Sequence, residues 1–246
     1  MNIKIQFFET LASTNEKAIQ LIDERKADEG VLIITDNQFK GRGHQDNKWE
    51  SEPGKNLTFS LIIRPVFLNA SEQFILNEVV CLSIIEALKK SLPGVQFLIK
   101  WPNDIYVGND KIAGVLIQHF LKGSKLNFSV IGIGININQT HFISEAPNPV
   151  SLKRITGKTF DKEEILQFFI KFFEQNYEKV KTISGRNVIY TSYLENLYKR
   201  EKKSKFKDKK GLFYGKIKGI NEFGQILISD EENHVRKYGF KELEWL

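Results

Sequence analysis

Residues 96–136 read QFLIKWPNDIYVGNDKIAGVLIQHFLKGSKLNFSVIGIGIN and predict a mixed or antiparallel sheet. Apolar runs of strand length cover 96–100, 104–107, 112–118 and 126–136, and Gly108-Asn109-Asp110 is a tight-turn sequence between two of them. Lys100 and Lys111 lie in or beside these runs, where a buried charge is costly unless it meets an anion or fixed oxygens. Either these lysines reach solvent at strand ends, or they contact a charged ligand.

The composition fits a globular protein of the size of an enzyme. A chain of 246 residues with 41% hydrophobic residues can bury the core of one large domain, alone or with a small appendage. Its one cysteine, Cys81, lies in an apolar run, which favours a core residue over a nucleophile. A single cysteine cannot form a disulfide within the chain, which suits a reducing compartment. No stretch resembles a signal peptide or is long enough to span a membrane, so we expect a cytoplasmic protein without a membrane partner.

The net charge of +6 comes from one segment, Lys199 to Lys210, which holds eight basic and two acidic residues. Because no groove-reading motif or aromatic interleaving accompanies this basic run, a solvated helix end and linker is favoured over a phosphate-binding surface. A nucleic-acid-binding protein is therefore a weaker alternative, and we expect no DNA partner. Docking of an acidic partner stays open.

The fold class expected from the whole chain is α+β, a mixed and mostly antiparallel sheet with helices packed on it. Ser13, with Glu16 three residues later, predicts a helix start, with the helix ending near Ala27 to Gly30. Further helices are expected at 71–91, 161–180 and 187–200, and further strands at 1–7, 31–35, 57–64, 212–220, 225–229 and 235–238. We expect a catalytic domain over 1–200 and a small C-terminal β-barrel domain over 205–246.

The polar stretch between Asp36 and Lys55 is long for a loop in a compact domain, which marks its segment Gln38 to Trp49 as a ligand-loop candidate. Its Gly41-Arg42-Gly43 could bring backbone amides and a guanidinium to an anion, although a flexible turn explains it equally well. Trp49 either fills the core or stacks on a ligand.

Three glycines in the predicted strands suggest that a ligand or another part of the chain comes close to the strand backbone. Gly114 follows Lys111 by three residues, and a glycine inside a strand often marks a nearby ligand. Gly132 and Gly134 share one strand face, which leaves room for a flat ligand or for a packed helix. The strand does not turn into a helix after them, so this is no dinucleotide-binding fingerprint. The four histidines lack ligand spacing and one cysteine cannot build a zinc site, so no protein-held metal is expected.

Taken together and in order, these motifs resemble the biotin protein ligase family over roughly the first 140 residues. The resemblance rests on Ser13-Thr14-Asn15, Gln38 with Gly41-Arg42-Gly43 and Trp49, Lys100-Trp101-Pro102-Asn103-Asp104, Lys111-Ile112-Ala113-Gly114 and Gly132-Ile133-Gly134-Ile135-Asn136. It implies that the last forty residues form an SH3-like barrel. The few residues ahead of Ser13 leave no room for the DNA-binding helix-turn-helix of some members, which suggests the monofunctional type.

The resemblance implies a two-step reaction. Biotin and ATP, which brings Mg²⁺ with it, condense to biotinyl-5′-AMP, and a lysine of a biotin carboxyl carrier domain, of acetyl-CoA carboxylase or a related carboxylase, then attacks this mixed anhydride. Lys111 and Arg42 are the expected catalytic cations because they would offset the repulsion between carboxylate and α-phosphate. A homodimer through a sheet edge is compatible with the sequence.

By similarity, two sets of residues hold the substrates. The biotin set is Ser13, Thr14, Asn15, Gln38, Gly41, Arg42, Gly43, His44, Lys111, Gly114, Gly132 and Gly134. The ATP and adenylate set is Arg42, Trp49, Asn103, Asp104, Lys111 and Asn136. Asp104 would help to position the incoming lysine or Mg²⁺, while Lys100 belongs to the scaffold that presents Asn103 and Asp104. The segment Gln139 to Ser151 is expected to form a lid over the nucleotide.

Two points qualify the resemblance. Many family members place a second arginine directly after Gly-Arg-Gly, where this chain has His44, so we expect easier escape of the adenylate and slower dissociation in a His44→Arg variant. Lipoate protein ligase shares the fold and the adenylation chemistry and is the nearest rival interpretation. Octanoyl-transferring relatives need a cysteine nucleophile, which Cys81 does not supply.

Overall fold

The computed structural model describes residues 1–43, 48–143 and 148–246. Its centre is a seven-stranded sheet in the order β1-β2-β3-β7-β6-β5-β4. Among the described strands of this sheet, β1 and β2 pair in parallel and the other neighbours pair antiparallel. The strands are β1 (Lys4–Leu11), β2 (Val31–Gln38), β3 (Leu57–Ile63), β4 (Phe97–Lys100), β5 (Asp104–Val107), β6 (Asp110–Lys122) and β7 (Lys125–Ile135).

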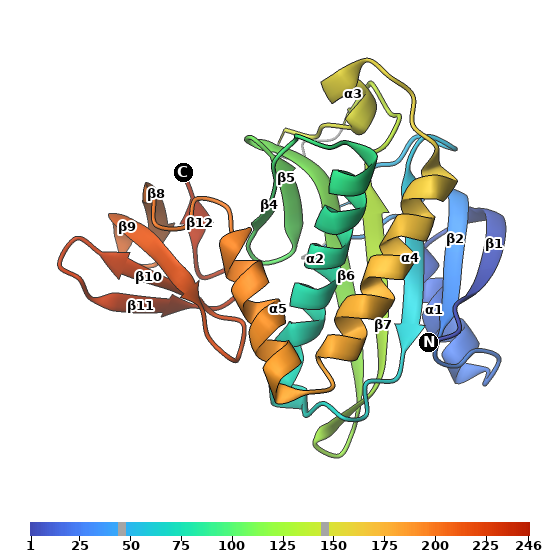
Figure 1. Ribbon diagram of the computed structural model, residues 1–246, viewed down its shortest axis with the longest axis horizontal. Coiled ribbons are helices and arrows are strands. Elements are labelled where there is room, and N and C mark those ends of the chain that lie inside the picture. Colours follow the sequence, from blue (N-terminus) through green and yellow to red (C-terminus); the bar gives the residue numbers. More distant parts are fainter. Residues whose placement is uncertain (44–47, 144–147) are drawn as a thin grey trace.

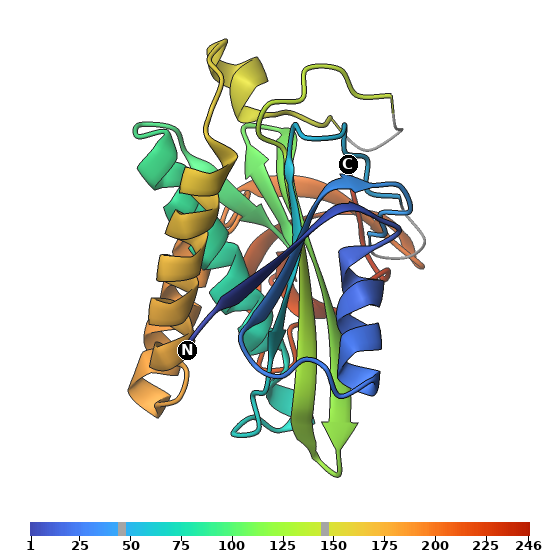
Figure 2. The ribbon, with the colours of Figure 1, turned by 90° about the vertical axis from the view of Figure 1, so that its right-hand side faces the viewer.

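Helices cover the two faces of this sheet unequally. The long helices α2 (Phe74–Ser91), α4 (Lys162–Lys179) and α5 (Ile183–Glu195) lie on one face, while α1 (Thr14–Asp23) lies on the other (Figures 1 and 2). Two short helical segments, the 3-10 turn Ala70–Glu72 and α3 (Leu152–Thr156), complete this part of the chain. The face that carries α1 is left partly open, and the candidate site lies there.

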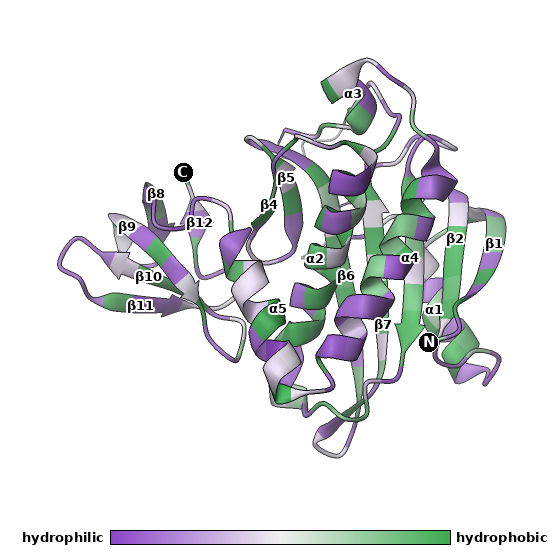
Figure 3. Cartoon of the chain, in the orientation of Figure 1, coloured by the Kyte–Doolittle hydropathy of each residue, from purple (hydrophilic) through white to green (hydrophobic). Residues whose placement is uncertain are grey.

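The core explains why these segments adopt these forms. All seven residues of β3 are buried, as expected of a central strand covered on both faces. Helix α2 is apolar almost all round because it packs against the sheet, α4 and α5 at once. Green, hydrophobic positions accordingly gather on the central strands and α2, while purple positions gather on the outer turns of α4 (Figure 3). Cys81 is fully buried in this core, as predicted, and burial raises the pKa of its thiol.

The C-terminal residues form a second, antiparallel sheet in the order β11-β10-β9-β8-β12. Its strands are β8 (Lys203–Asp208), β9 (Gly211–Ile220), β10 (Ile226–Asp230), β11 (Val235–Tyr238) and β12 (Glu244–Trp245). This arrangement is consistent with the expected SH3-like domain, although the pairings do not close a barrel. Trp101 joins the two sheets, because its indole Nε1 donates to the Gly224 carbonyl at 2.9 Å and its ring packs on Phe240.

The interpretation of the basic run as a helix end and linker is wrong for residues 203–208, while residues 199–202 do lie in the connection after the last helix. Residues 203–208 form β8, an inner strand of the second sheet, whose Phe206 is fully buried. Lysines occupy the outer face of β8, and Lys203 and Lys207 pair with Glu231 at 2.7 Å and Glu244 at 3.3 Å. A strand with one apolar residue among lysines carries almost no alternating hydrophobic signal, which is why the pattern suggested a linker.

Several element bounds also differ from expectation. Ser13 caps α1 by accepting from the Glu16 N–H, as predicted, but the helix ends at Asp23 and Arg25 adopts a left-handed conformation. Strand β2 continues to Gln38, three residues beyond the predicted end. The last helix runs over Ile183–Glu195 rather than 187–200. Within the described residues, no helix combines the length and apolarity needed to cross a membrane.

Candidate active site

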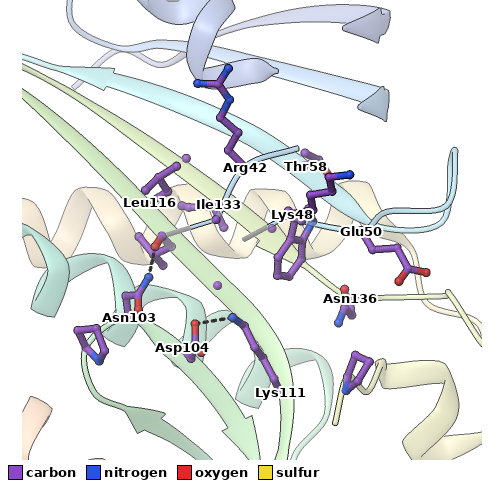
Figure 4. A pocket seen from close by; sticks show the side chains of 18 of the residues that line it. Arg42, Lys48, Glu50, Thr58, Asn103, Asp104, Lys111, Leu116, Ile133 and Asn136 are labelled. Carbon is purple, nitrogen blue, oxygen red and sulfur yellow. Dashed lines mark hydrogen bonds and ion pairs between the residues drawn. The ribbon is translucent and has the colours of Figure 1, made fainter. Parts of the chain in front are cut away.

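An open pocket of about 900 Å³ lies on the α1 side of the sheet. Its walls come from the N-terminus of α1, the end of β2, the loop after β2, strands β5 to β7 and residues 240–245, which lead into the last strand of the second sheet. The pocket therefore gathers residues from each of the motifs that carry the resemblance, whereas Gly41 and Lys100 of these motifs do not line it. Figure 4 shows Asp104 and Lys111 on one side of it and Arg42 on the other.

One end of the pocket is a network of neutral polar side chains. The backbone N–H of Thr14 donates to Gln38 Oε1 at 2.8 Å, which fixes the Gln38 amide at the end of β2. Asn15 Nδ2 donates to Gln118 Oε1 at 2.9 Å and to the Leu116 carbonyl at 3.3 Å. Ser60 Oγ lies 2.7 Å from Thr14 Oγ1 and 2.6 Å from Asn15 Oδ1. We name these side chains together with Ser13 the polar end of the pocket.

The glycines of β7 give room to protein side chains. A Cβ on Gly132 would lie 2.2 Å from Asn15 Oδ1, and a Cβ on Gly134 would lie 2.2 Å from the Trp49 ring. A Cβ on Gly114 would also meet the Trp49 ring, at 3.2 Å. The bare strand face therefore receives Asn15 of helix α1 at Gly132 and the Trp49 indole at Gly134, so the helix fills one part of it and the loop after β2 fills the other.

The loop after β2 closes on itself next to the pocket. Trp49 N–H donates to the Gly41 carbonyl at 3.0 Å, and a Cβ on Gly41 would lie 2.5 Å from the Trp49 carbonyl oxygen. Gly41 thus permits a close backbone approach that carries Trp49 over β7. His44 lies outside the described residues, so its predicted role stays a prediction.

The other end of the pocket holds charges. Lys111 Nζ forms an ion pair with Asp104 Oδ1 at 2.7 Å, and each side chain is about one-fifth exposed, 20% and 21%. The same ammonium lies 5.8 Å from the centre of the Trp49 ring. The carbonyl of Lys111 accepts from the Val150 N–H, and the Lys111 N–H donates to the Asn148 carbonyl, so residues 148–150 hold the start of β6. We name Lys111 and Asp104 the charged end.

Arg42 lines the pocket, but its guanidinium does not reach Lys111. It pairs with Glu16 at 2.8 Å, with 67% of the side chain exposed, and points away from Lys111 in Figure 4. The structure therefore brings Lys111 and Asp104 together but leaves Arg42 apart from them. A side chain this exposed can exchange its partner at small cost.

Lys100 lies one strand away from the charged end. Its Nζ is 3.2 Å from the Tyr106 hydroxyl and faces the rings of Tyr106 and Trp245. Burial lowers the pKa of Lys100, while Asp104 acts in the opposite direction. Lys100 is thus held by aromatic rings at the joint between the two sheets, which agrees with the expected scaffold role.

Two polar atoms in the pocket have no hydrogen-bond partner among the described residues. They are the indole Nε1 of Trp49 and Oδ1 of Asn136, and both are buried. Because an unpaired buried polar atom is costly, these two atoms mark positions where a polar ligand would restore hydrogen bonds. Asn103, in contrast, uses its Nδ2 to hold the Val115 carbonyl, which fixes the turn before β5 against β6.

The segment Gln139 to Ser151 flanks the pocket in part. Phe142, Ile143 and Pro149 line it, and Gln139 ties the segment to the loop after β2 through Glu52, Asn56 and Glu50. Residues 144–147 lie outside the described structure. The lid function therefore stays a prediction.

Sequence reasoning missed some pocket residues. Phe240, Leu243 and Trp245 line the pocket but come from the far end of the chain, and Ser60 and Gln118, which hold pocket residues by hydrogen bonds, lack a motif of their own. The one usable signal was a serine within the otherwise apolar β3 run LTFSLII. Within the described residues, no group of three or more His, Cys, Asp or Glu side chains is placed to hold a metal ion.

Comparison with known proteins gives a consistent result. Residues 7–136 match the model of the Biotin/lipoate A/B protein ligase family. The chain is 29% identical over 238 residues to the bifunctional ligase/repressor BirA of Bacillus subtilis, which covers 94% of this chain and 71% of that relative. It is 30% identical over 168 residues to the biotin–[acetyl-CoA-carboxylase] ligase of Paracoccus denitrificans, covering 65% of this chain and 68% of the relative.

Solved structures agree in fold. The biotin protein ligase from Aquifex aeolicus in complex with biotin and ATP superposes with a TM-score of 0.80 at 30% identity, covering 99% of both chains. The apo structure of the same Aquifex protein gives a TM-score of 0.76 at 26% identity. The likeness thus extends over both sheets.

Proposed function

The chain belongs to the Biotin/lipoate A/B protein ligase family and is an ATP-dependent biotin ligase, and we propose that it activates biotin in this pocket and transfers it to a lysine of a biotin carboxyl carrier domain. The observation that carries the proposal is the pairing of a neutral polar end with a charged end in one pocket. Biotin has the matching shape, because its ureido ring is polar and uncharged while its valerate ends in a carboxylate.

The polar end supports binding of the ureido ring. Ser13, Thr14 and Gln38 are buried and already fixed by hydrogen bonds within the protein. Side chains that are ordered before binding lose little entropy when the ligand arrives, so such a site can bind a small neutral ring tightly.

The charged end supports the chemistry. A carboxylate oxygen of biotin attacks the α-phosphorus of ATP, the bond to the bridging oxygen breaks, and pyrophosphate leaves. Lys111 would exchange Asp104 for these two anions and offset their repulsion. In the second step the carrier lysine attacks the acyl carbon, AMP leaves, and Asp104, released from Lys111, would help to orient the incoming amine.

The unpaired atoms support the placement of the nucleotide. Asn136 Oδ1 and Trp49 Nε1 would find partners on the adenylate, and Arg42 would turn from Glu16 toward the phosphate. ATP would bring Mg²⁺ with its phosphates. Well-oriented reactants can gain on the order of 7–11 kcal/mol from positioning alone, so no protein nucleophile is required.

The position of residues 240–245 suggests the side from which the carrier domain would reach the pocket. Phe240, Lys241 and Trp245 line the pocket beside the charged end, and Phe240 is 47% exposed. An acceptor domain would therefore approach between the two sheets. We also propose a cytoplasmic location, no DNA partner, and self-association through a free sheet edge.

Biotin-dependent exchange of labelled pyrophosphate into ATP tests this function, with lipoate measured in parallel. We expect exchange with biotin and none with lipoate. Exchange with lipoate alone would indicate a lipoate ligase. Salt-dependent RNA binding without any exchange would favour the nucleic-acid-binding alternative.

A further inference from the structure

We propose that Ser60 is a positioning residue that fixes the direction of the Thr14 hydroxyl hydrogen and so presents Thr14 to the ligand as a hydrogen-bond acceptor. The inference rests on the proposed function, since it assigns the polar end to the ureido ring. Ser60 lies on the central strand β3 and is fully buried, and its hydroxyl contacts two residues of the pocket.

The orientation of the Asn15 amide comes first. Asn15 Nδ2 donates to two carbonyl oxygens, that of Leu116 and that of the Gln118 side chain. An amide nitrogen is a donor and an amide oxygen is an acceptor. With its nitrogen held by these two acceptors, the amide turns Oδ1 toward Ser60.

The Ser60 hydrogen is then assigned. Ser60 Oγ lies 2.6 Å from Asn15 Oδ1, which has no hydrogen to donate, so the hydroxyl hydrogen of Ser60 must lie between these two oxygens. A hydroxyl has only one hydrogen. Toward Thr14, at 2.7 Å, Ser60 Oγ can therefore only accept.

The Thr14 hydrogen follows from this. Its two protein acceptors are Ser60 Oγ at 2.7 Å and Gln38 Oε1 at 3.3 Å. The shorter contact is the better hydrogen bond, and Gln38 Oε1 already receives the Thr14 backbone N–H at 2.8 Å. The hydrogen of the Thr14 hydroxyl thus points to Ser60, and a lone pair of Thr14 Oγ1 faces the pocket.

This arrangement selects a chemical class of ligand. Ser13 Oγ accepts the Glu16 N–H, which leaves its own hydrogen free to donate into the pocket. A donor, Ser13, thus lies next to an acceptor, Thr14. A cyclic urea offers the complement, a carbonyl oxygen beside a ring N–H, whereas a dithiolane ring offers neither and would leave these groups unpaired.

A double-mutant cycle of Ser60→Ala and Thr14→Val tests the inference, with the biotin Kd measured by calorimetry on the full chain. Each single variant should weaken biotin binding about tenfold, since each unpairs a buried polar group. Because Ser60 acts through Thr14, the double variant should bind no more weakly than Thr14→Val alone. In pyrophosphate exchange, the Ser60→Ala variant should raise the KM for biotin by about the same factor as the Kd and change kcat much less.

Matched controls separate this role from a structural one. Ser129→Ala removes another fully buried strand serine, whose hydroxyl contacts His119 Nδ1 at 2.9 Å, and should leave the biotin Kd unchanged. Ser60→Cys keeps a weak donor in place and should bind biotin with an intermediate Kd, which tests the inference if Ser60→Ala does not fold.

Additive effects of the two substitutions, or a wild-type Kd in Ser60→Ala or in Ser60→Cys, would overturn the role of Ser60. A wild-type chain that does not bind biotin would instead overturn the proposed function.

Discussion

The two ends of the pocket are prepared for their ligand in opposite ways. At the polar end, Asn15, Thr14, Gln38 and Ser60 are buried and satisfy one another, so little has to move when a neutral ring binds. At the charged end, Lys111 is neutralised by Asp104, so an ion pair must open before an anion can be held. Groups that bind a neutral ring can be ordered before the ligand arrives. A buried cation without a counter-ion would destabilise the ligand-free fold too strongly.

The largest effect should come from removing the cation of the charged end. Lys111→Ala should lower the rate of pyrophosphate exchange by about 10²–10³-fold, because preorganised charge at a developing anion has that order of effect. Thermal unfolding should stay near that of the wild type, since the ion pair is partly exposed. Unchanged exchange would show that another residue supplies the charge.

A smaller effect should follow from filling the space beside Asn15. Gly132→Ala places a Cβ where Asn15 Oδ1 lies, so it should disrupt the polar end and weaken biotin binding about tenfold or more. Gly239→Ala is the control, because its nearest heavy atom, on Glu242, would be 3.5 Å from the new Cβ. A biotin Kd that is equal in all three proteins would mean that Asn15 does not have to be held in place.

Helix α2 carries a buried titratable residue, Glu78, that lies in neither end of the pocket. Burial raises the pKa of Glu78 to about 8, so the folded protein binds a proton that the unfolded chain releases between its ordinary pKa of 4.5 and that value. Stability therefore falls as the pH rises through this window, and Glu78→Gln should stabilise the fold at pH 7 by on the order of 2 kcal/mol.

Urea unfolding at pH 5 and pH 7 measures this difference. The gain from Glu78→Gln should be larger at pH 7 and the biotin Kd should not change. An equal gain at both pH values would show that Glu78 is not protonated in the fold.

The smallest effect should come from a change beside Arg42, the second expected catalytic cation. Glu16→Gln should free Arg42 from its exposed pair and lower the KM for ATP about two- to threefold, while stability changes by less than about 0.5 kcal/mol. Steady-state exchange at varied ATP checks this. A higher KM for ATP would mean that Glu16 positions Arg42 rather than withholding it.

Much of this arrangement could be predicted from local sequence. The Ser13 cap, the strand runs and the Lys111 motif each carry a signal within a few residues. The network around Ser60 could not, because it joins α1, β3 and β6 through contacts of 45 to 103 residues in sequence separation. Strand β8 was missed for a different reason, since its outer lysines are solvated and only Phe206 is buried.

The central claim, that the polar end is fixed and the charged end must rearrange, is tested most directly by a crystal structure of the complex with biotinyl-5′-AMP. We predict that the Ser60 contacts with Thr14 and Asn15 keep the 2.7 and 2.6 Å lengths found without ligand, while Lys111 leaves Asp104 and contacts the adenylate. A complex in which Lys111 still pairs with Asp104, while Asn15 and Ser60 have separated, would contradict the account.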